Sequence, residues 1–329
     1  MGPLVSVIIA AYNSGAWLAD TIDSALAQTG ARCEIILVDD GSAEDVRARV
    51  RPYGSAVSYI RQENAGSGAA RNTGLRAASG DFIAFLDHDD VWLPDKLSIQ
   101  LAVATQHPES GLIVCDGVQF DGDRILRPSL FDVRLAARFA ATPKNEITGP
   151  FYLEFVDSNH VACPAQTLIP RAVVERIGAL AEGRGEASDL DYYLRIAHDY
   201  PVTFHRDRLV RWRYLASSES GPQERRSIEW ALMAVAVLGR HQAVCAPQYR
   251  PLVASRFRQL ALESARKAFH YGLVRDRAYA RVCLVKLRRL APRESRAAIY
   301  LAGLRLPPAV ATALVHRWVW AKDLWRVDA

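Results

Sequence analysis

Short apolar runs rich in β-branched residues alternate with helical patterns through the first 115 residues of this chain. Such runs predict buried strands at Val5–Ala11, Glu34–Val38, Val57–Arg61, Asp81–Leu86 and Leu112–Cys115. Helical segments separate the runs, and one of them begins at Pro94 and ends near His107. This alternation with short connections predicts an α/β fold, a mostly parallel sheet flanked by helices. Ligands of such sheets bind beyond the carboxyl ends of the strands, so functional residues should directly follow the strands.

The remaining two thirds of the chain show three further patterns. Residues 117–150 have weak periodicity and several prolines and glycines, which predicts a loop-rich insertion. Short elements then return, namely a helix around Ala172–Ile177, a helix that opens at Ser188 and a strand around Val202–His205. Beyond Pro222 the pattern is entirely helical. We therefore expect an α/β part followed by a C-terminal helical subdomain.

Charge is distributed unevenly between these two parts. The net charge is +5, yet residues 225–329 hold 20 Lys and Arg against 6 Asp and Glu, whereas residues 1–224 hold 21 against 30. The two parts therefore face different partners, or each other. The acidic larger part argues against nucleic-acid binding.

Cysteine usage and hydropathy bear on the compartment. The five cysteines are odd in number, widely spaced and without a CxxC pair, which argues against a disulfide framework or structural zinc. The N-terminal residues lack the basic and apolar regions of a secretory signal. The sequence contains no 18-residue uncharged apolar stretch, so no transmembrane span is predicted. We expect a cytoplasmic protein.

The basic helical tail admits several uses. It could pack on the acidic part, mediate self-association into a homo-oligomer, lie on an anionic membrane surface, or simply expose solvated arginines. Near the C-terminus three tryptophans lie beside three basic residues, a composition that suits a membrane interface: Trp318, Trp320 and Trp325 with Arg317, Lys322 and Arg326. A peripheral location at the inner face of the membrane is the corresponding expectation.

Polar residues follow each of the first four predicted strands where folding alone does not require them. They are Tyr12-Asn13, Asp39-Asp40, Asn64-Ala65-Gly66 leading to Arg71-Asn72, and Asp87-His88-Asp89-Asp90. The three carboxylates of the last group would repel one another if unpaired. A divalent cation that prefers oxygen ligands, Mg²⁺ or Mn²⁺, would relieve that repulsion. The alternative is a solvated acidic turn that precedes the next helix.

Taken in order, these sites resemble the motifs of the family 2 glycosyltransferases of GT-A fold. The matching segments are Ser6–Asn13, Ile36–Ser42, Asn64–Gly66 with Ala70–Leu75, and Phe85–Asp90. The resemblance covers roughly residues 4–215. It implies a GT-A catalytic domain over residues 1–221, with a nucleotide-sugar-binding half (1–116) and an acceptor-side half (117–221), followed by a basic helical region (222–329).

The activity implied by the resemblance is an inverting transfer of a sugar from a nucleotide diphosphate to an acceptor hydroxyl. The expected donor is a UDP-sugar and the expected acceptor is a glycan or a lipid-linked glycan. Synthesis of a cell-envelope or extracellular polysaccharide or glycoconjugate is the expected setting. The alternative is a nucleotide-sugar-binding module without turnover.

The resemblance also implies roles for five residues of the donor side. Tyr12 would lie against the base, Asp39 would accept the imino N–H of uracil, and Arg71 would reach the diphosphate or the base. Asp87 would face the ribose and the metal, and Asp89 would ligate Mn²⁺ or Mg²⁺. An interfacial tyrosine, a turn-forming aspartate and a surface-helix arginine are the purely structural alternatives for the first three.

The catalytic base implied by the resemblance is Asp189, in the stretch Ser188–Ala197. An inverting transfer needs a carboxylate that takes the proton of the attacking hydroxyl. Ser188 stands where the family usually has a glutamate, and the same residues also read as an N-cap followed by first-turn acids. Asp191 and Glu186 are the alternative bases.

Three residues are candidates for the acceptor side: His160, Gln166 and Asp191. A buried structural role is the alternative for the first two. One further departure from the family lies at Arg213-Tyr214-Leu215, where Leu215 replaces a histidine that can approach the metal in relatives.

Two other enzyme classes fit the sequence poorly. Gly66-Ser67-Gly68 begins like a dinucleotide-binding fingerprint, but Arg71 stands where the third glycine belongs and the segment does not follow the first strand. A glycosidase would use paired carboxylates but would have no need of an arginine and an acidic cluster at the ends of parallel strands.

Overall fold

The structure is a computed structural model that describes residues 2–183, 187–215, 224–293, 296–307 and 309–311. The chain divides into two compact units, Met1–Ser218 and Glu219–Ala329. The predicted boundary between residues 221 and 222 lies among residues 216–223, outside the described part of the chain, and stays a prediction.

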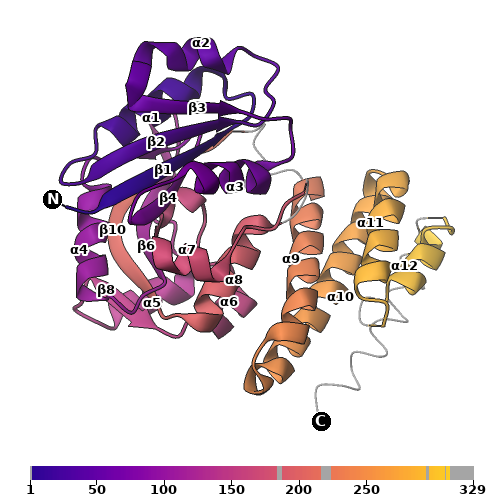
Figure 1. The fold of residues 1–329 in the computed structure, drawn as a ribbon. Helices are drawn as coiled ribbons and strands as arrows, with labels where there is room; N and C mark the ends of the chain where they lie inside the picture. Colours follow the sequence, from indigo (N-terminus) through magenta and orange to yellow (C-terminus); the bar gives the residue numbers. More distant parts are fainter. Residues whose placement is uncertain (1, 184–186, 216–223, 294–295, 308, 312–329) are drawn as a thin grey trace. The chain divides into compact units, whose positions relative to one another are not determined.

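The first unit is built on a ten-stranded mixed sheet flanked by helices (Figure 1). Its first half is wholly parallel, in the order β3-β2-β1-β4. These strands are β1 (Leu4–Ala11), β2 (Arg32–Asp39), β3 (Val57–Arg61) and β4 (Phe82–Asp87). The connecting helices are α1 (Leu18–Leu26), α2 (Val46–Val50) and α3 (Ser67–Ala77), with short 3-10 turns at Gly15–Trp17 and Arg51–Ala56. The predicted fold class is confirmed.

The second half of the sheet mixes parallel and antiparallel pairs. The short strand β9 (Thr167–Pro170) joins β4 to β6 (Leu112–Asp121), and β6 pairs in parallel with β10 (Val202–Arg213). The antiparallel partners β5 (Val91–Trp92), β7 (Arg124–Arg127) and β8 (Glu146–Gly149) complete it. Its helical segments are α4 (Lys96–Gln106), α5 (Val133–Ala140), α6 (Tyr152–Asp157), a 3-10 turn (Pro164–Gln166), α7 (Arg171–Ile177) and α8 (Ser188–Asp199).

The prediction of a loop-rich insertion over residues 117–150 is wrong. β6 continues to Asp121 and turns through Gly122, which has a positive φ of 56°, into the exposed strand β7. Helix α5 follows, with Asp132 accepting a hydrogen bond from the Leu135 amide at its N-terminus. These elements are short, four residues in β7 and eight in α5, so each offers too few positions for its period to stand out in the sequence.

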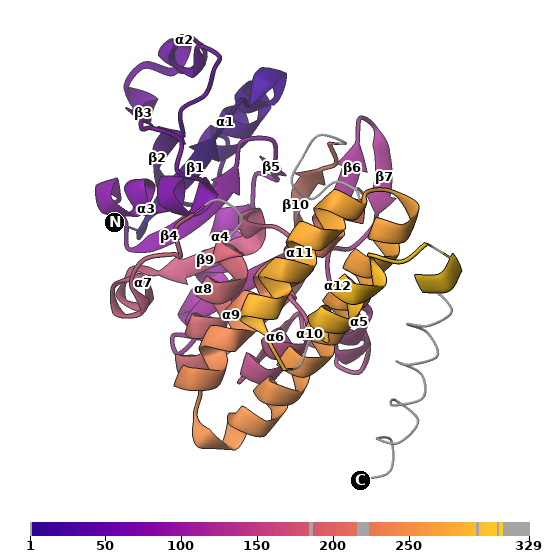
Figure 2. The same ribbon diagram turned by 90° about the vertical axis from the view of Figure 1, so that its right-hand side faces the viewer.

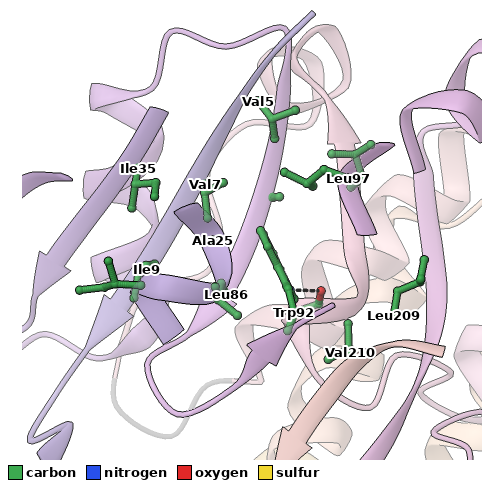
Figure 3. Packing of buried hydrophobic residues seen from close by; sticks show 14 of the residues in the cluster. Val5, Val7, Ile9, Ala25, Ile35, Leu86, Trp92, Leu97, Leu209 and Val210 are labelled. Atoms are coloured by element: carbon green, nitrogen blue, oxygen red, sulfur yellow. Dashed lines mark hydrogen bonds between the residues drawn. The ribbon is translucent and has the colours of Figure 1, made fainter. Parts of the chain in front are cut away.

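The core explains why β1 reads as a continuous apolar run. Alternate residues of β1, from Val5 to Ala11, pack with α1, α2 and α4 on one face of the sheet (Figure 3). On the other face Ala10 packs against Ala70 of α3. Because both faces of β1 are covered, apolar residues occupy both faces instead of alternating with polar ones, and buried Ser6 is the exception. Trp92 packs in the same apolar cluster as Val5, Val7 and Ile9, and its indole N–H donates to Ala165 O at 2.9 Å.

One cation is enclosed in this core. Lys96, at the start of α4, is fully buried, donates Nζ to Thr167 O at 3.0 Å and lies 4.0 Å from the centre of the Trp92 ring. Burial lowers the pKa of Lys96 to about 8, although nearby cysteines oppose the shift. The folded protein therefore holds this proton less tightly than the unfolded chain does.

The second unit is helical. It contains α9 (Glu224–Val244), a 3-10 turn (Pro247–Tyr249), α10 (Arg250–Val274), α11 (Arg277–Leu290) and α12 (Ala297–Gly303). Among the described residues, no helix has the length and apolarity needed to cross a membrane. The tryptophan and arginine cluster predicted for a membrane interface, residues 317–326, lies outside the described residues.

We predict that Lys96→Met flattens the pH dependence of stability. Between about pH 8 and pH 10.5 the unfolded chain binds the Lys96 proton and the folded protein does not, so wild-type stability rises with pH. That rise amounts to about 3 kcal/mol from the pKa difference. Urea unfolding of both proteins at pH values from 7 to 10.5 measures it. Parallel profiles for wild type and variant would contradict the buried charge.

Candidate functional site

Strand register gathers the predicted residues at one edge of the sheet. Ala11 at the end of β1 pairs with Asp39 of β2, and its neighbour Ala10 pairs with Asp87 of β4. Asp39 pairs in turn with Arg61 of β3. The carboxyl ends of four parallel strands therefore carry these side chains within a single edge, as the α/β pattern predicted.

Tyr12 lies on the first loop of this edge. The loop is fixed by Asn13, a non-glycine residue with a positive φ of 48°, whose amide donates to Ser42 Oγ and whose side-chain oxygen accepts from the Ala43 amide. This ties the end of β1 to the end of β2. The Tyr12 side chain is left 48% exposed, so its ring is available to stack on a planar ligand.

Asp39 has no exposed surface and already accepts several hydrogen bonds. Oδ1 accepts from the Ser42 amide at 2.9 Å, and Oδ2 accepts from Tyr59 Oη at 2.8 Å and Arg61 Nη1 at 2.5 Å. Burial alone would raise the pKa of Asp39, but these hydrogen bonds and the Arg61 charge lower it. A base N–H could reach this carboxylate only if a present donor moved. Arg61, whose side chain is 50% exposed, is the donor freest to move.

Asp40 organises the neighbouring loop. Its carboxylate accepts from Gln62 Nε2 at 2.7 Å and from the amides of Ala65 and Gly66 at 2.9 and 2.8 Å. These contacts fix the segment that leads into α3, where Gly66 has a φ of 94° that favours glycine. Sequence reasoning gave Asp40 no separate role.

The acidic turn after β4 concentrates negative charge. Asp87 is partly exposed, Asp89 is half-buried and Asp90 is fully buried. Burial raises the pKa of Asp89, and the Asp87 charge adds to it; burial and both neighbouring carboxylates raise the pKa of Asp90. His88 contributes a contact of 3.1 Å from Nδ1 to Ala10 O, which holds the turn against β1.

The donor set of this turn suits a hard divalent cation but is incomplete. Within the described part of the chain, Asp90 Oδ2 is buried without a hydrogen-bond partner, so the turn carries an uncompensated carboxylate oxygen. No three ligating side chains of the described residues are gathered around one metal position. A cation bound by Asp87 or Asp89 would therefore take its remaining ligands from a substrate and from water, as Mg²⁺ commonly does.

Arg71 is buried beneath the acidic turn. Its side chain is 7% exposed, and Nη2 donates to Asp87 Oδ1 at 2.7 Å. Burial opposes the charge, yet attraction to Asp87 and Asp189 raises the pKa of Arg71 above its ordinary value. Arg71 thus lies within electrostatic reach of both the acidic turn and the predicted base.

Asp189 is held near this cluster by residues of α3. Asn72 donates Nδ2 to Leu180 O at 3.0 Å and accepts from the Leu180 amide at 2.9 Å, and it also bonds Glu182. These contacts fix residues 180 and 182 against α3. A Cβ at Gly68 would lie 2.3 Å from Ala181 O and 3.1 Å from Ser188 Cβ, so only glycine permits this approach.

The environment of Ser188 differs from the N-cap interpretation. Ala187 is the N-cap of α8, without a side-chain cap, and Ser188 is buried in the first turn against Gly68. Asp189 is half-buried, and its Oδ1 accepts from the Leu190 amide at 2.8 Å. The alternative base Glu186 lies outside the described residues.

Arg213 holds the acidic turn from the other side. Its Nε donates to Asp89 O and its amide donates to Asp90 Oδ1, at 2.9 and 3.0 Å. The guanidinium is sandwiched between Trp17 and Phe120, 4.1 and 4.7 Å from the ring centres. The sequence sets Arg213 apart only as part of Arg213-Tyr214-Leu215, where Leu215 is the departure from the family. Arg213 and Asp89 are more than a hundred residues apart in the chain, so no local sequence pattern predicts their contact.

The three predicted acceptor residues are engaged in packing. Gln166 has no exposed surface; its amide donates to Cys115 O and accepts from the amides of Ala162 and Cys163. His160 is buried against aromatic rings with Nδ1 3.2 Å from Asp132 Oδ2, and burial lowers its pKa. Asp191 bonds Arg195, whose guanidinium also binds Ile177 O and Ala179 O.

Comparison with known proteins identifies what this arrangement is similar to. The sequence profile described as "Glycosyl transferase family 2" matches residues 6–178, slightly more than half of the chain. An uncharacterised glycosyltransferase of Rickettsia prowazekii is 29% identical over 215 residues, 65% of each chain. The match to a Rickettsia felis relative covers 36% of that protein. The chain thus spans less than two thirds of either relative.

The chain is also similar to a relative whose name gives its reaction and to two proteins of known structure. The Escherichia coli UDP-Glc:alpha-D-GlcNAc-diphosphoundecaprenol beta-1,3-glucosyltransferase WfgD is 41% identical over 102 residues, 30% of this chain and 40% of that one. Staphylococcus aureus TarS 1–349 with UDP-GlcNAc has a TM-score of 0.59 at 17% identity, covering 94% of this chain and 87% of TarS. Pyrobaculum calidifontis PcManGT, with GDP-Man and Mn²⁺, has 0.54 at 19%, covering 99% and 88%.

We predict that Asn72→Ala loosens the chain before Asp189. Leu180 loses a buried partner for its amide and one for its carbonyl, which costs roughly 1–3 kcal/mol. Hydrogen exchange of the Leu180 amide should become at least tenfold faster. Arg76→Gln, an exposed change on the same helix, is the control and should leave that exchange rate unchanged. Equal protection of Leu180 in wild type and Asn72→Ala would refute this role of Asn72.

Proposed function

We propose that this chain, which belongs to glycosyl transferase family 2, transfers a sugar from a nucleotide diphosphate to an acceptor hydroxyl with inversion at the sugar carbon. The observation that carries the proposal is the convergence of three groups at one sheet edge. Asp87 ends β4, Asp89 follows it, and Arg71 of α3 bonds Asp87. Gly68 of the same helix lies against Ser188, the residue before Asp189. Donor-side charges and a candidate base thus share one site.

The transfer step needs a single proton acceptor from the protein. In the proposed step the acceptor oxygen forms a bond to the anomeric carbon as its proton passes to the Asp189 carboxylate. The bond from that carbon to the diphosphate oxygen breaks, and its electron pair leaves with the nucleotide diphosphate. The base must come within hydrogen-bond reach of the attacking hydroxyl, so its carboxylate must be accessible to the acceptor. Asp189 is only half-buried, which leaves it partly accessible.

The proposed donor is a UDP-sugar. The base stacks on the exposed Tyr12 ring, and the uracil N–H reaches Asp39 once Arg61 shifts away from the carboxylate. The names of WfgD and of the TarS complex include UDP-glucose and UDP-GlcNAc, which supports this choice, whereas PcManGT was solved with GDP-mannose. Arg71 acts on the donor side chiefly through Asp87, since its own guanidinium is nearly covered.

A divalent cation, Mn²⁺ or Mg²⁺, fits the acidic turn. Asp89 and Asp87 supply oxygen ligands, and Arg213 fixes the backbone of Asp89. When bound, the cation neutralises charge on the leaving diphosphate. The Mn²⁺ named with PcManGT supports the same choice.

The proposed acceptor is a glycan hydroxyl, with a lipid-linked glycan of the cell envelope as the leading candidate. The support is the name of WfgD, whose acceptor is a diphosphoundecaprenol-linked sugar. His160, Gln166 and Asp191 do not form part of this proposal, because their polar groups are buried or engaged with neighbours.

A nucleotide-sugar-binding module without turnover is the second candidate. The observation that favours it is Ser188, which replaces the glutamate usual before the family's base and leaves one acidic residue fewer beside Asp189. A protein of this kind would bind the nucleotide-sugar with metal and release no nucleotide diphosphate in the presence of any acceptor.

We predict that Asp189→Asn lowers turnover by roughly 10²–10⁴-fold, the usual worth of a general base. Nucleotide-sugar affinity should change little, because the proton is accepted only in the transition state. Release of nucleotide diphosphate from a UDP-sugar panel with a polyprenyl-diphosphate-linked sugar acceptor measures turnover. Calorimetry measures affinity.

Asp191→Asn is the matched comparison on the same helix turn. It removes the ion pair with Arg195 and should cost stability, while turnover per folded molecule stays within about threefold. Abolished transfer in Asp191→Asn with normal transfer in Asp189→Asn would exchange the two assignments. Binding without turnover in the wild type would favour the binding module.

We also predict that UDP binding depends on a divalent cation. Calorimetry should give an affinity on the order of tenfold or more higher with Mn²⁺ than with a chelator, because Asp87 and Asp89 would hold a cation that offsets the charge of the diphosphate. Asp89→Asn should abolish that difference, whereas Asp121→Asn, an exposed aspartate at the end of β6, should keep it. Equal affinities with Mn²⁺ and with chelator in the wild type would exclude the metal role.

A further inference from the structure

Helix α11 presents an unusual outer face within the C-terminal unit. Its inner face, formed by Ala280, Cys283, Leu284 and Leu287, is buried against the other helices of that unit. Figure 2 shows α11 beside α12 within the unit. Asp276 is the N-cap of the helix, and its carboxylate accepts from the Tyr279 amide. The buried inner face fixes which side chains point outward.

The outer face combines apolar and basic side chains. Val282 is 67% exposed and Val285 is 39% exposed, an uncommon state for β-branched residues. Helical spacing places both valines on one stripe with Ala278, and Arg289 continues this stripe at its C-terminal end. Exposed basic residues flank the stripe, Arg281 and Arg288 on one side and Lys286 on the other. The sequence Arg277–Leu290 contains no acidic residue.

The acids of neighbouring helices do not neutralise this face. In the described part of the unit, Asp276 pairs with Arg225 at 2.6 Å, Glu229 accepts from Tyr279 Oη, and Glu263 accepts from Gln259. Among the described residues, Arg281, Lys286, Arg288 and Arg289 form no ion pair. The face therefore keeps four positive charges around an apolar stripe.

We propose that this outer face of α11 is a docking surface for an anionic membrane. Basic side chains on both flanks meet acidic headgroups, while the two valines and the alanine enter the boundary between headgroups and acyl chains. The helix then lies in the plane of the membrane, held by charge and shallow burial rather than by insertion. The inference rests on α11 alone and is independent of the proposed transfer reaction.

A membrane fits this face better than a nucleic acid does. Nucleic-acid binding uses hydrogen-bonding and stacking side chains between the basic residues. Here the residues between them, Ala278, Val282 and Val285, are aliphatic. A flat lipid surface accepts both aliphatic and basic side chains along one straight helix. The commitment to anionic lipid is testable because a neutral membrane offers the same acyl chains without the charge.

The test is co-sedimentation of the full chain with vesicles. Wild type should bind phosphatidylcholine vesicles that contain about 30 mol% phosphatidylglycerol at least tenfold more strongly than pure phosphatidylcholine vesicles. Binding should weaken as salt is raised toward 1 M, because the Debye length falls from about 10 Å to about 3 Å. The triple variant Arg281→Gln, Lys286→Gln, Arg289→Gln should lose at least tenfold of the anionic-vesicle affinity.

A matched triple variant controls for net charge. Arg32→Gln, Arg124→Gln, Lys144→Gln removes three exposed basic residues from the first unit and should bind like wild type. Val282→Glu should weaken anionic binding without altering the number of basic residues. Equal binding of wild type to neutral and anionic vesicles, equal loss in the two triple variants, or binding of a short DNA duplex in place of vesicles would each overturn the proposal. Circular dichroism confirms that the variants are folded.

Discussion

The parallel register of β1, β2 and β4 is the constraint on which the rest of the first unit depends. It pairs Ala10 with Asp87 and Ala11 with Asp39, so carboxylates that are 48 residues apart in the chain lie at the same edge of the sheet, on the two strands that flank β1. A slip by one residue would turn each of these side chains to the opposite face of the sheet. Both faces of β1 are buried, and the apolar packing of its alternate residues with α1 and α3 fixes the register.

Bringing carboxylates together in this way creates a charge problem that the fold solves with arginines. Arg71 pairs with Asp87 from below, Arg61 pairs with Asp39, and Arg213 reaches the turn from β10. The compensation remains incomplete at Asp89 and Asp90, where burial and neighbouring charge favour the protonated form. A site that is fully balanced in the free protein would gain little from a charged ligand, so the residual imbalance at Asp89 and Asp90 is the feature that the proposed cation would relieve.

Sequence reasoning worked where local pattern and chemistry coincide. The strands that end at Asp39 and Asp87 were predictable because a buried parallel strand must be continuously apolar, and the polar residues after them stand out against that run. The burial of Asp39 was not predictable, since it depends on Tyr59 and Arg61 of the neighbouring strand. The hydrogen bonds of Asn72 to Leu180 and of Arg213 to Asp89 were equally unpredictable from the sequence. Each joins segments about 110 or more residues apart, and an asparagine on a helix carries no sign of its distant partner.

The contact of Gly68 with Ala181 and Ser188 has an evolutionary consequence. A Cβ at residue 68 would occupy the space that now separates Gly68 from the Ser188 side chain and from Ala181 O. Substitutions at the two positions are therefore coupled, and their effects cannot add independently. A lineage that carries a larger residue at 188 has to move the backbone at 181 or 188 away from residue 68 in the same step, or lose the close approach. Positions 68 and 188 should thus covary among relatives of this chain, and the order in which they change is restricted: each accepted replacement at one sets which replacements the other can tolerate.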